Sequence, residues 1–277
     1  EMLRSLVGSE MCIRDRVEKS VELIDEGATI PFIARYRKEV TGSLNDEQLR
    51  ALSERLVYLR NLEEKKASVL ATIEEQGKLT DELKKQIEAV MTMVALEDLY
   101  RPYRPKRRTR ATIAKEKGLE PLAEILRAQA TTRTIEEEAT AFVDAEKGVE
   151  SVQDAIDGAK DILAEVYADD ADYRTKLRAM TKESGSLVAK AKDEEADSVY
   201  EMYYDFSEPI KKLVGHRILA INRGEAEKFL TVKIEAPRQE ILLWLVKQII
   251  GNMKHDSASY LYEAITDSYD LSLIHIS

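Results

Sequence analysis

The sequence has 277 residues, of which 44% are hydrophobic and 34% are charged, and its formal net charge is -10. A chain this acidic is repelled as a whole by a polyanion, so any contact with nucleic acid has to come from a local basic surface. The single cysteine, Cys12, excludes an internal disulfide and a cysteine metal framework, which fits a reducing compartment and a cytoplasmic location.

Helix-forming residues dominate the composition, since Gly and Pro number only 11 and 6. We therefore expect an all-α fold. Neither an apolar run that could cross a bilayer nor a signal peptide is recognisable, so no membrane partner is expected. Residues 1–16 and 270–277 depart from the neighbouring helical patterns and resemble translated cloning scars, so we interpret them as non-native tails. Between them we expect a helical domain at 17–200 and a helix–strand–helix segment at 201–269.

The first patterned stretch runs from Val17 to Glu26, and Gly27 is expected to end that helix. Pro31 stands where the first turn of the next helix tolerates proline. Farther on, Asn45 and Gln48 have the spacing of a capping box, with Ser43 as the alternative cap.

A long helix is expected from this capping box to about Gln76, followed by a stop at Gly77 and a new helix from Thr80. The two helices would form an αα-hairpin. The apolar positions of the first helix recur every three or four residues, at Leu49, Leu52, Leu56, Leu59, Leu62, Val69 and Ile73.

Pro102 and Pro105 exclude a regular helix in the next segment, and helical patterning resumes at Pro121. The cluster Asp169, Asp170 and Asp172 could suggest calcium, but it lacks the loop glycine and has Thr181 where a bidentate glutamate belongs. We interpret this cluster as a helix boundary.

One strand signal stands out, the alternation of Leu230, Val232 and Ile234 with polar residues. Residues 187–191 are a possible partner, which predicts a minor two-stranded β element. Before it, Gly224 is expected to end a helix in a left-handed turn, and after it Pro237 opens another helix.

The strongest positive signal is a basic segment at positions 100–110. Arginine matches phosphate oxygens with two donors, and tyrosine rings can stack on bases. Two interpretations stay open, because the same arginines could pair with the chain's own carboxylates, and the tyrosines could be packing residues. The candidate nucleic-acid-binding residues here are Tyr100, Arg101, Tyr103, Arg104, Lys106, Arg107, Arg108 and Arg110.

A second basic segment contributes weaker candidates, Arg35, Arg37 and Lys38, with the alternative that Tyr36 simply anchors a helix. A third contains basic residues between 211 and 223 that we interpret as structural. No phosphate loop, dinucleotide fingerprint or hydrolase motif is present, and His216 and His255 stand alone. We therefore expect no enzyme, no cofactor and no metal site.

Three long strings resemble the N-terminal helical region of the Tex family of bacterial transcription accessory proteins: IPFIARYRKEVTGSLNDEQLRALSERLVYLRNLEEKK, LEDLYRPYRPKRRTRATIAKEKGLEPLAEIL and YYDFSEPIKKLVGHRILAINRGE. The resemblance implies an elongated, helix-rich, RNA-binding protein with a helix-turn-helix-like part. It also implies that an RNase H-like domain and a C-terminal RNA-binding domain would follow residue 269.

Together these observations predict a non-catalytic, nucleic-acid-associated module of a transcription accessory protein. The resemblance favours RNA over DNA, with weak binding in this fragment, and allows contact with the transcription or ribosomal machinery. The alternative is an interaction scaffold that docks downstream domains or such a partner without touching nucleic acid. Carboxylates within reach of Arg101 to Arg110 would favour the scaffold.

Overall fold

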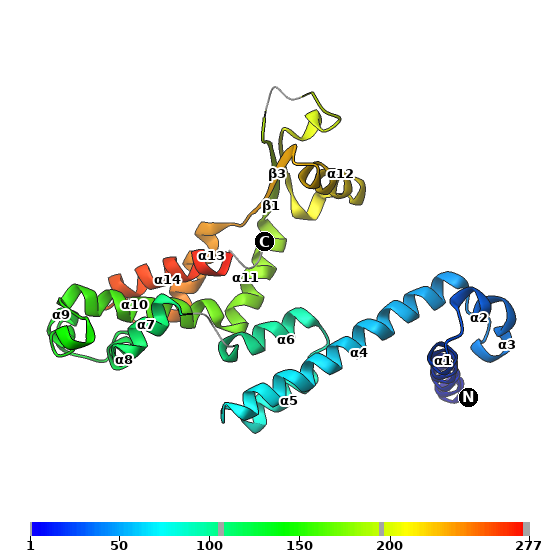
Figure 1. Cartoon of the computed structure of the whole chain (residues 1–277), viewed down its shortest axis with the longest axis horizontal. Coiled ribbons are helices and arrows are strands. Elements are labelled where there is room, and N and C mark those ends of the chain that lie inside the picture. The colour runs from blue at the N-terminus through cyan, green and yellow to red at the C-terminus, as the bar shows by residue number, and fades with distance from the viewer. Residues whose placement is uncertain (1, 105–107, 194–196, 274–277) are drawn as a thin grey trace. The chain divides into compact units, whose positions relative to one another are not determined.

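The computed structural model describes residues 2–104, 108–193 and 197–273, with side chains described between residues 13 and 271 (Figure 1). Within them the chain is mostly helical and carries a small antiparallel sheet, which confirms the predicted class. The chain divides into two compact units, residues 1–96 and 97–277, here called unit 1 and unit 2. None of the described helices combines the length and the apolar character needed to span a bilayer.

Unit 1 begins with a long helix and two short ones, α1 (Met2–Asp25), α2 (Ile30–Tyr36) and α3 (Lys38–Thr41). Pro31 lies in the first turn of α2, as predicted. Gly27 and Gly42, with φ of 86° and 64°, take the left-handed conformation that separates α1 from α2 and α3 from α4. Residues 2–16 are helical and continue into the rest of α1, and the non-native origin of this stretch stays a prediction.

The αα-hairpin of unit 1 is confirmed. In α4 (Asp46–Glu75), the Asn45 side chain accepts a hydrogen bond from the Gln48 backbone, and the Gln48 side chain accepts one from the Asn45 backbone. In α5 (Asp81–Ala89), the Thr80 hydroxyl caps the first turn. The predicted apolar stripe of α4 is buried at Leu49, Leu62, Val69 and Ile73, whereas its middle part is half-buried.

Helix α6 (Met93–Tyr100) crosses the boundary between the units, and its second half opens unit 2. A 3-10 turn, η1 (Arg101–Tyr103), comes directly after it, so the predicted absence of a regular helix around Pro102 is confirmed for the described residues. The next helices are α7 (Arg110–Glu116), α8 (Glu120–Ala128) and α9 (Ile135–Thr140), and a second 3-10 turn, η2 (Ala145–Lys147), precedes α10.

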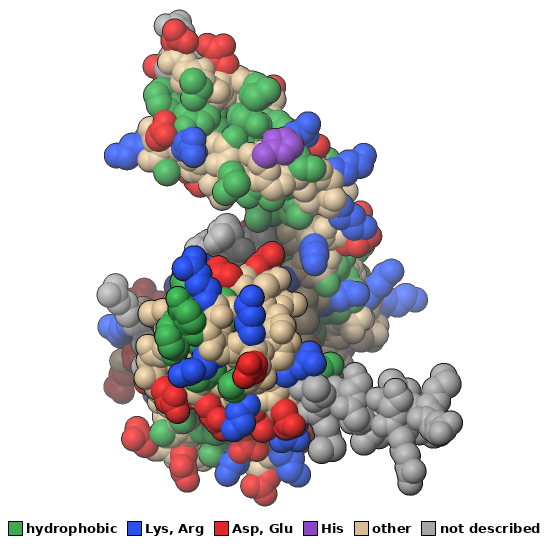
Figure 2. Space-filling model, turned by 90° about the vertical axis from the view of Figure 1, so that its right-hand side faces the viewer, with side chains coloured by type: hydrophobic (Ala, Val, Ile, Leu, Met, Phe, Trp, Pro, Cys, Tyr) green, Lys and Arg blue, Asp and Glu red, His purple; other side chains and the backbone are tan. Residues whose placement is uncertain are grey.

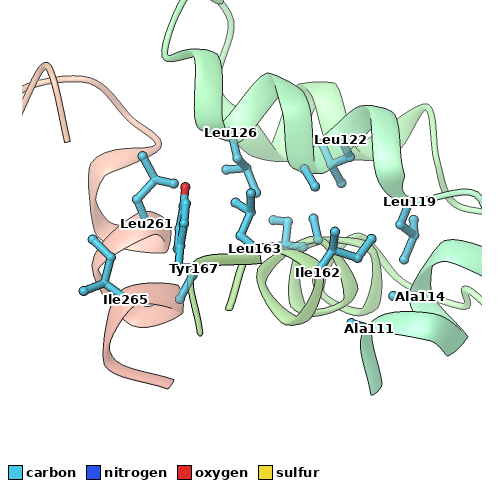
Figure 3. Packing of buried hydrophobic residues seen from close by; sticks show 14 of the residues in the cluster. Ala111, Ala114, Leu119, Leu122, Leu126, Ile162, Leu163, Tyr167, Leu261 and Ile265 are labelled. Atoms are coloured by element: carbon cyan, nitrogen blue, oxygen red, sulfur yellow. The ribbon is translucent and has the colours of Figure 1, made fainter. Parts of the chain in front are cut away.

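The core of unit 2 surrounds α10 (Val152–Asp169), which packs against α7, α8, α9 and the last helix, α14 (Ala258–Leu273). Figure 3 shows the buried side chains that fill this space, including Leu122 and Leu126 from α8 and Leu163 from α10. Leu261 and Ile265 of α14 close the cluster from the other side. The core therefore joins segments that are far apart in the sequence.

Tyr167 of α10 lies in this core, and its hydroxyl is buried without a hydrogen-bond partner among the described residues. Burial raises the pKa of Tyr167, because the phenolate would be poorly solvated there. We expect Tyr167→Phe to leave the free energy of unfolding unchanged or to raise it by about 1–3 kcal/mol, since an unsatisfied buried polar atom is removed. Urea unfolding of the two proteins measures the difference, and a clear loss of stability would show that the hydroxyl has a partner.

The acidic cluster after α10 is a helix boundary, as predicted. Helix α10 ends at Asp169, and α11 (Ala171–Ser184) begins two residues later. The Asp170 side chain accepts a hydrogen bond from the Tyr173 backbone amide at 2.9 Å, which caps α11. The Asp170 carboxylate therefore organises the start of α11.

The sheet of unit 2 has three strands in the order β2-β1-β3, so the predicted two-stranded element is wrong in its strand number. The predicted pair is present as β1 (Ser186–Ala191) and β3 (Leu230–Glu235), with Ala189 opposite Val232. The missed strand is β2 (Asp205–Pro209), which pairs antiparallel with β1. It is short, ends in proline and has one large apolar residue, Phe206, so it shows no convincing alternation.

Short turns and three helices complete unit 2. The 3-10 turns η3 (Glu201–Tyr203) and η4 (Ile210–Lys212) flank β2, and α12 (Gly215–Ala226) leads into β3. After β3, the predicted helix from Pro237 is α13 (Arg238–Ile249). Residues 270–273 continue α14, and residues 274–277 lie outside the described part of the chain.

Gly224 does not end α12, which corrects the prediction of a left-handed turn at this residue. It lies inside the helix, where an added Cβ would stand 2.7 Å from Cδ1 of Leu230. The left-handed residue is Lys228, with a φ of 67°, two positions after the helix ends. Glycine at residue 224 therefore lets α12 pack closely against Leu230 of β3, whose side chain would have to shift for a larger residue.

Candidate nucleic-acid interface

The basic segment of residues 100–110 spans three elements of unit 2. Tyr100 ends α6, Arg101 and Tyr103 belong to η1, and Arg110 begins α7. Lys106 and Arg107 lie outside the described residues. Both tyrosines are half-buried, which favours packing over open stacking surfaces.

Arg101 is held by the protein's own acid. Its Nε atom lies 2.6 Å from Oδ1 of Asp169, and the side chain of Asp169 is only 9% exposed. A hydrogen-bonded pair in such a sheltered place keeps its partners together, because separating them would leave a poorly solvated carboxylate. Arg101 is therefore engaged inside unit 2 and is not free to contact phosphate.

A second and deeper ion pair lies one helical turn earlier in α6. Asp98 accepts a hydrogen bond from Nε of Arg174 at 2.8 Å, and both side chains are 5% exposed. Arg178 contacts the same carboxylate from the next turn of α11. Burial lowers the pKa of Arg174, and the neighbouring Arg101 lowers it further. The Asp98 network thus fixes the end of α6 to α11.

Arg110 faces a cluster of carboxylates. Its guanidinium lies 2.7 Å from Asp267 and 3.3 Å from Asp161. These residues line a polar cavity of about 400 Å³, to which Asp157, Lys160 and Glu263 also contribute. Burial raises the pKa of Asp161, which is the expected response of a carboxyl group removed from water. With four acids and two cations around it, this cavity repels a polyanion.

Two arginines of the basic segment are more open. Arg108 pairs with Glu116 at 3.1 Å, but both side chains are largely exposed, so the pair is easily exchanged for other contacts. Arg104 is exposed, and no ion pair of its side chain occurs among the described residues. The described part of the segment therefore provides two accessible cations in place of a continuous basic strip.

The second basic segment forms an open surface of unit 1, here called the α2–α3 surface and made of Phe32, Arg35, Tyr36, Arg37 and Lys38. All five side chains are exposed, with Tyr36 at 67% and Phe32 at 41%. Within the described ranges, none of the three cations has a carboxylate partner. In Figure 2, exposed hydrophobic side chains lie beside Lys and Arg side chains on the surface of the protein.

The aromatic rings of the α2–α3 surface lie together. The centroids of Phe32 and Tyr36 are 5.4 Å apart, and the Arg37 guanidinium lies 5.4 Å from the Phe32 centroid. They share a helix face because they are four residues apart in α2. The buried residue of α2 is Ile33, which is fully covered, so the alternative in which Tyr36 anchors the helix is wrong. Phe32 is not among the binding residues predicted from the sequence, although its ring is exposed beside them.

The third basic segment contains both paired and exposed, unpaired basic residues in the described structure. Lys211 contacts Glu183, and Arg217 donates to both carboxylate oxygens of Glu208 at 2.7 Å, which raises the pKa of Arg217. The Arg217 pair fits the structural role predicted for this segment, whereas the Lys211 pair is largely exposed, like that of Arg108. Lys212, His216 and Arg223 are exposed, and no ion pair of theirs occurs in the described part of the chain.

His216 and His255 do not belong to a group that could hold a metal ion in the part of the chain that the structure describes. Among the described residues, His, Cys, Asp and Glu do not gather in groups of three or more that could bind an ion. Nδ1 of His255 lies 2.8 Å from the Ser257 hydroxyl, and its Nε2 lies 2.9 Å from the Thr131 carbonyl oxygen. These bonds tie the start of α14 to the loop before α9, and His216 stands exposed on α12.

The fold and its surfaces define a mostly helical protein with local basic surfaces on an acidic chain. Residues 3–74 match the family described as Tex-like protein N-terminal domain, and residues 130–262 match the family described as Tex central region-like. The chain belongs to the Tex family, as the sequence resemblance indicated.

Similar proteins come from bacteria and animals. YdcI of Bacillus subtilis (strain 168) is 43% identical over 272 residues, which cover 97% of this chain and 38% of YdcI. The transcriptional accessory protein Tex of Neisseria gonorrhoeae is 46% identical over 79% of this chain and 29% of its own length. The S1 RNA-binding domain-containing protein 1 of Homo sapiens is 30% identical over 90% of this chain and 26% of its own length. The chain therefore spans little more than a third of YdcI, and less of the other two relatives.

Proposed function

We propose that this chain is a non-catalytic, nucleic-acid-associated module of a transcription accessory protein, with RNA preferred over DNA. The observation that carries the proposal is the α2–α3 surface, where exposed cations without carboxylate partners in the described structure lie beside two exposed aromatic rings. The names of two relatives support it, since one is a transcriptional accessory protein and the other contains an S1 RNA-binding domain.

The α2–α3 surface suits flexible, single-stranded nucleic acid. Arginine and lysine neutralise phosphates, while an aromatic ring stacks on any base and contributes roughly 1–3 kcal/mol per base. Because the net charge of the chain is -10, we expect binding to be weak and strongly dependent on salt. The proposed role in transcription favours RNA as the nucleic acid that is bound.

The test is a salt-titrated anisotropy measurement with single-stranded RNA and the full chain. The triple variant Arg35→Glu, Arg37→Glu, Lys38→Glu should bind at least about tenfold more weakly, and each phosphate contact that it removes should reduce the salt slope by about one. The matched control, Lys78→Glu, Lys84→Glu, Lys85→Glu, makes the same charge change on exposed lysines around α5 of unit 1. Equal affinities of the two triple variants would remove the α2–α3 surface from the mechanism.

A second candidate function, the interaction scaffold, is supported by the pairing of Arg101 and Arg110 with internal acids. In this case the segment of residues 100–110 holds unit 2 together and does not touch nucleic acid. The same measurement distinguishes the two functions through Arg104→Glu with Arg108→Glu. Loss of RNA affinity in this variant would assign the segment to nucleic acid, whereas unchanged affinity would leave it as a structural tie.

A further inference from the structure

The part of unit 2 that contains α12 concentrates positive charge in an acidic protein. Residues 209–224 read PIKKLVGHRILAINRG and contain no Asp or Glu, although the whole chain has a net charge of -10. Two of the cations are neutralised by Glu183 and Glu208, but Lys212 and Arg223 have no such partner among the described residues. Glu225 and Glu227 follow this run directly, so the unpaired positive charge is confined to Lys212 before α12 and Arg223 on it.

Helix α12 is attached to the sheet by a narrow face. Only Ile221 and Gly224 are buried, and they pack toward Leu230 of β3 and Tyr200. The other positions are exposed or half-buried, and Leu219 is 71% exposed. In the upper part of Figure 2, which holds the sheet and α12, hydrophobic and basic side chains share the surface with acidic ones. A helix that protrudes in this way is free to enter a groove.

The outward face of α12 combines small, apolar and base-reading side chains. Gly215, Leu219, Asn222 and Ala226 succeed one another at four- and three-residue spacing, so they form a single line along the helix. By the same periodicity, His216 and Arg223 flank this line on one side, and Ile218 and Glu225 flank it on the other. The acidic residue of α12, Glu225, therefore lies at the edge of this face and not at its centre.

These side chains have the chemistry that duplex DNA presents in its major groove. That groove admits an α-helix, and it offers paired acceptors and donors to Asn and Arg and a thymine methyl group to apolar side chains. The small residues Gly215 and Ala226 allow the helix to approach closely, while Lys212 is placed before the helix to meet a phosphate. The deep, narrow major groove of A-form RNA does not accept a helix in the same way.

We propose that α12 is a second nucleic-acid site, which docks its outward face in the major groove of B-form duplex DNA. Leu219 and Asn222 contact base edges, and Lys212 and Arg223 contact the phosphate backbone. The inference rests on the proposed association with nucleic acid, but it uses a different surface and a different form of nucleic acid from the α2–α3 surface.

The experiment measures binding of the full chain to a DNA duplex, an RNA duplex and single-stranded RNA over a series of KCl concentrations. Lys212→Gln with Arg223→Gln should weaken binding to the DNA duplex about tenfold and reduce its salt slope by about two, since each phosphate contact accounts for about one unit of slope. Leu219→Glu should weaken duplex binding further, by placing an acid at the centre of the face. Affinity for single-stranded RNA should change little.

The matched control is Lys190→Gln with Lys233→Gln, two exposed lysines on the face of the sheet that α12 does not cover. This control should bind the DNA duplex like the unchanged protein, and circular dichroism verifies that all variants are folded. If the Lys212 and Arg223 variant matches the control, the α12 site is overturned. An equal loss for both duplexes would also overturn groove docking.

These measurements distinguish failure of the α12 site from failure of the proposed function. If the α2–α3 variant loses binding to single-stranded RNA and the α12 variant binds the DNA duplex unchanged, the proposed function is supported and the α12 site is overturned. The reverse pattern removes the α2–α3 surface and keeps α12. Absence of binding to any nucleic acid at low salt removes both.

Discussion

Replacing Asp98 by Asn is expected to lower the free energy of unfolding of unit 2 by roughly 3–5 kcal/mol, because removing one partner of a buried pair leaves the other charge uncompensated. Arg174 and Asp98 are each 5% exposed and 2.8 Å apart, so water cannot replace the missing carboxylate. The single tryptophan, Trp244, lies in α13 and packs edge-on against Tyr173 of α11. Its fluorescence during urea unfolding therefore reports on unit 2.

Glu116→Gln is the matched control for Asp98→Asn, since it removes a carboxylate from the exposed pair with Arg108. Exposed pairs contribute about 0–1 kcal/mol, so this variant should unfold almost like the unchanged protein. Replacing Asp98 by Leu together with Arg174 and Arg178 by Met should recover much of the stability, because no buried charge is left unpaired. Similar midpoints for Asp98→Asn and Glu116→Gln would show that the Asp98 network is solvated.

Leu163→Ala is expected to destabilise unit 2 by roughly 2–5 kcal/mol, through the loss of buried methyl groups and the cavity they leave. Leu163 is 2% exposed and lies between α8 and α10 in Figure 3. The control on the same helix is Val166→Ala at a position that is 42% exposed, for which we expect a change of about 0.5 kcal/mol or less. The midpoint and slope of the urea transition of both variants, measured by circular dichroism, give the difference. Equal effects at the two positions would contradict the assignment of this core.

Local chemistry made the helices of this protein predictable. The capping box at Asn45 and Gln48, the cap at Thr80 and the boundary at Asp170 each depend on side chains within three residues of the backbone they bind. The sequence therefore contains the whole interaction. The β1–β3 pair was also predicted, because alternation in β3 was clear, whereas β2 has too few apolar residues to show it.

Partners that are distant in the sequence made the candidate site less predictable. Arg101 meets Asp169, which is 68 residues away, and Arg110 meets Asp267, which is 157 residues away. No local pattern shows which cation of an acidic chain finds such a partner. For this reason two of the four described cations of the densest basic segment, Arg101 and Arg110, are engaged by internal acids, while the shorter segment at residues 35–38 is open. Gly224 was misassigned for a similar cause, since its close neighbour Leu230 belongs to the next strand.

The contribution of α14 to the core around α10 has a consequence for the order in which the nascent chain can fold. Leu261 and Ile265 cover α10 from a position about a hundred residues later in synthesis. The hairpin of α4 and α5 uses only neighbouring segments, so it can form as soon as it leaves the ribosome. The apolar side of helices α7 to α10 stays exposed until translation has passed residue 273. During that interval these helices are prone to aggregate and to bind chaperones.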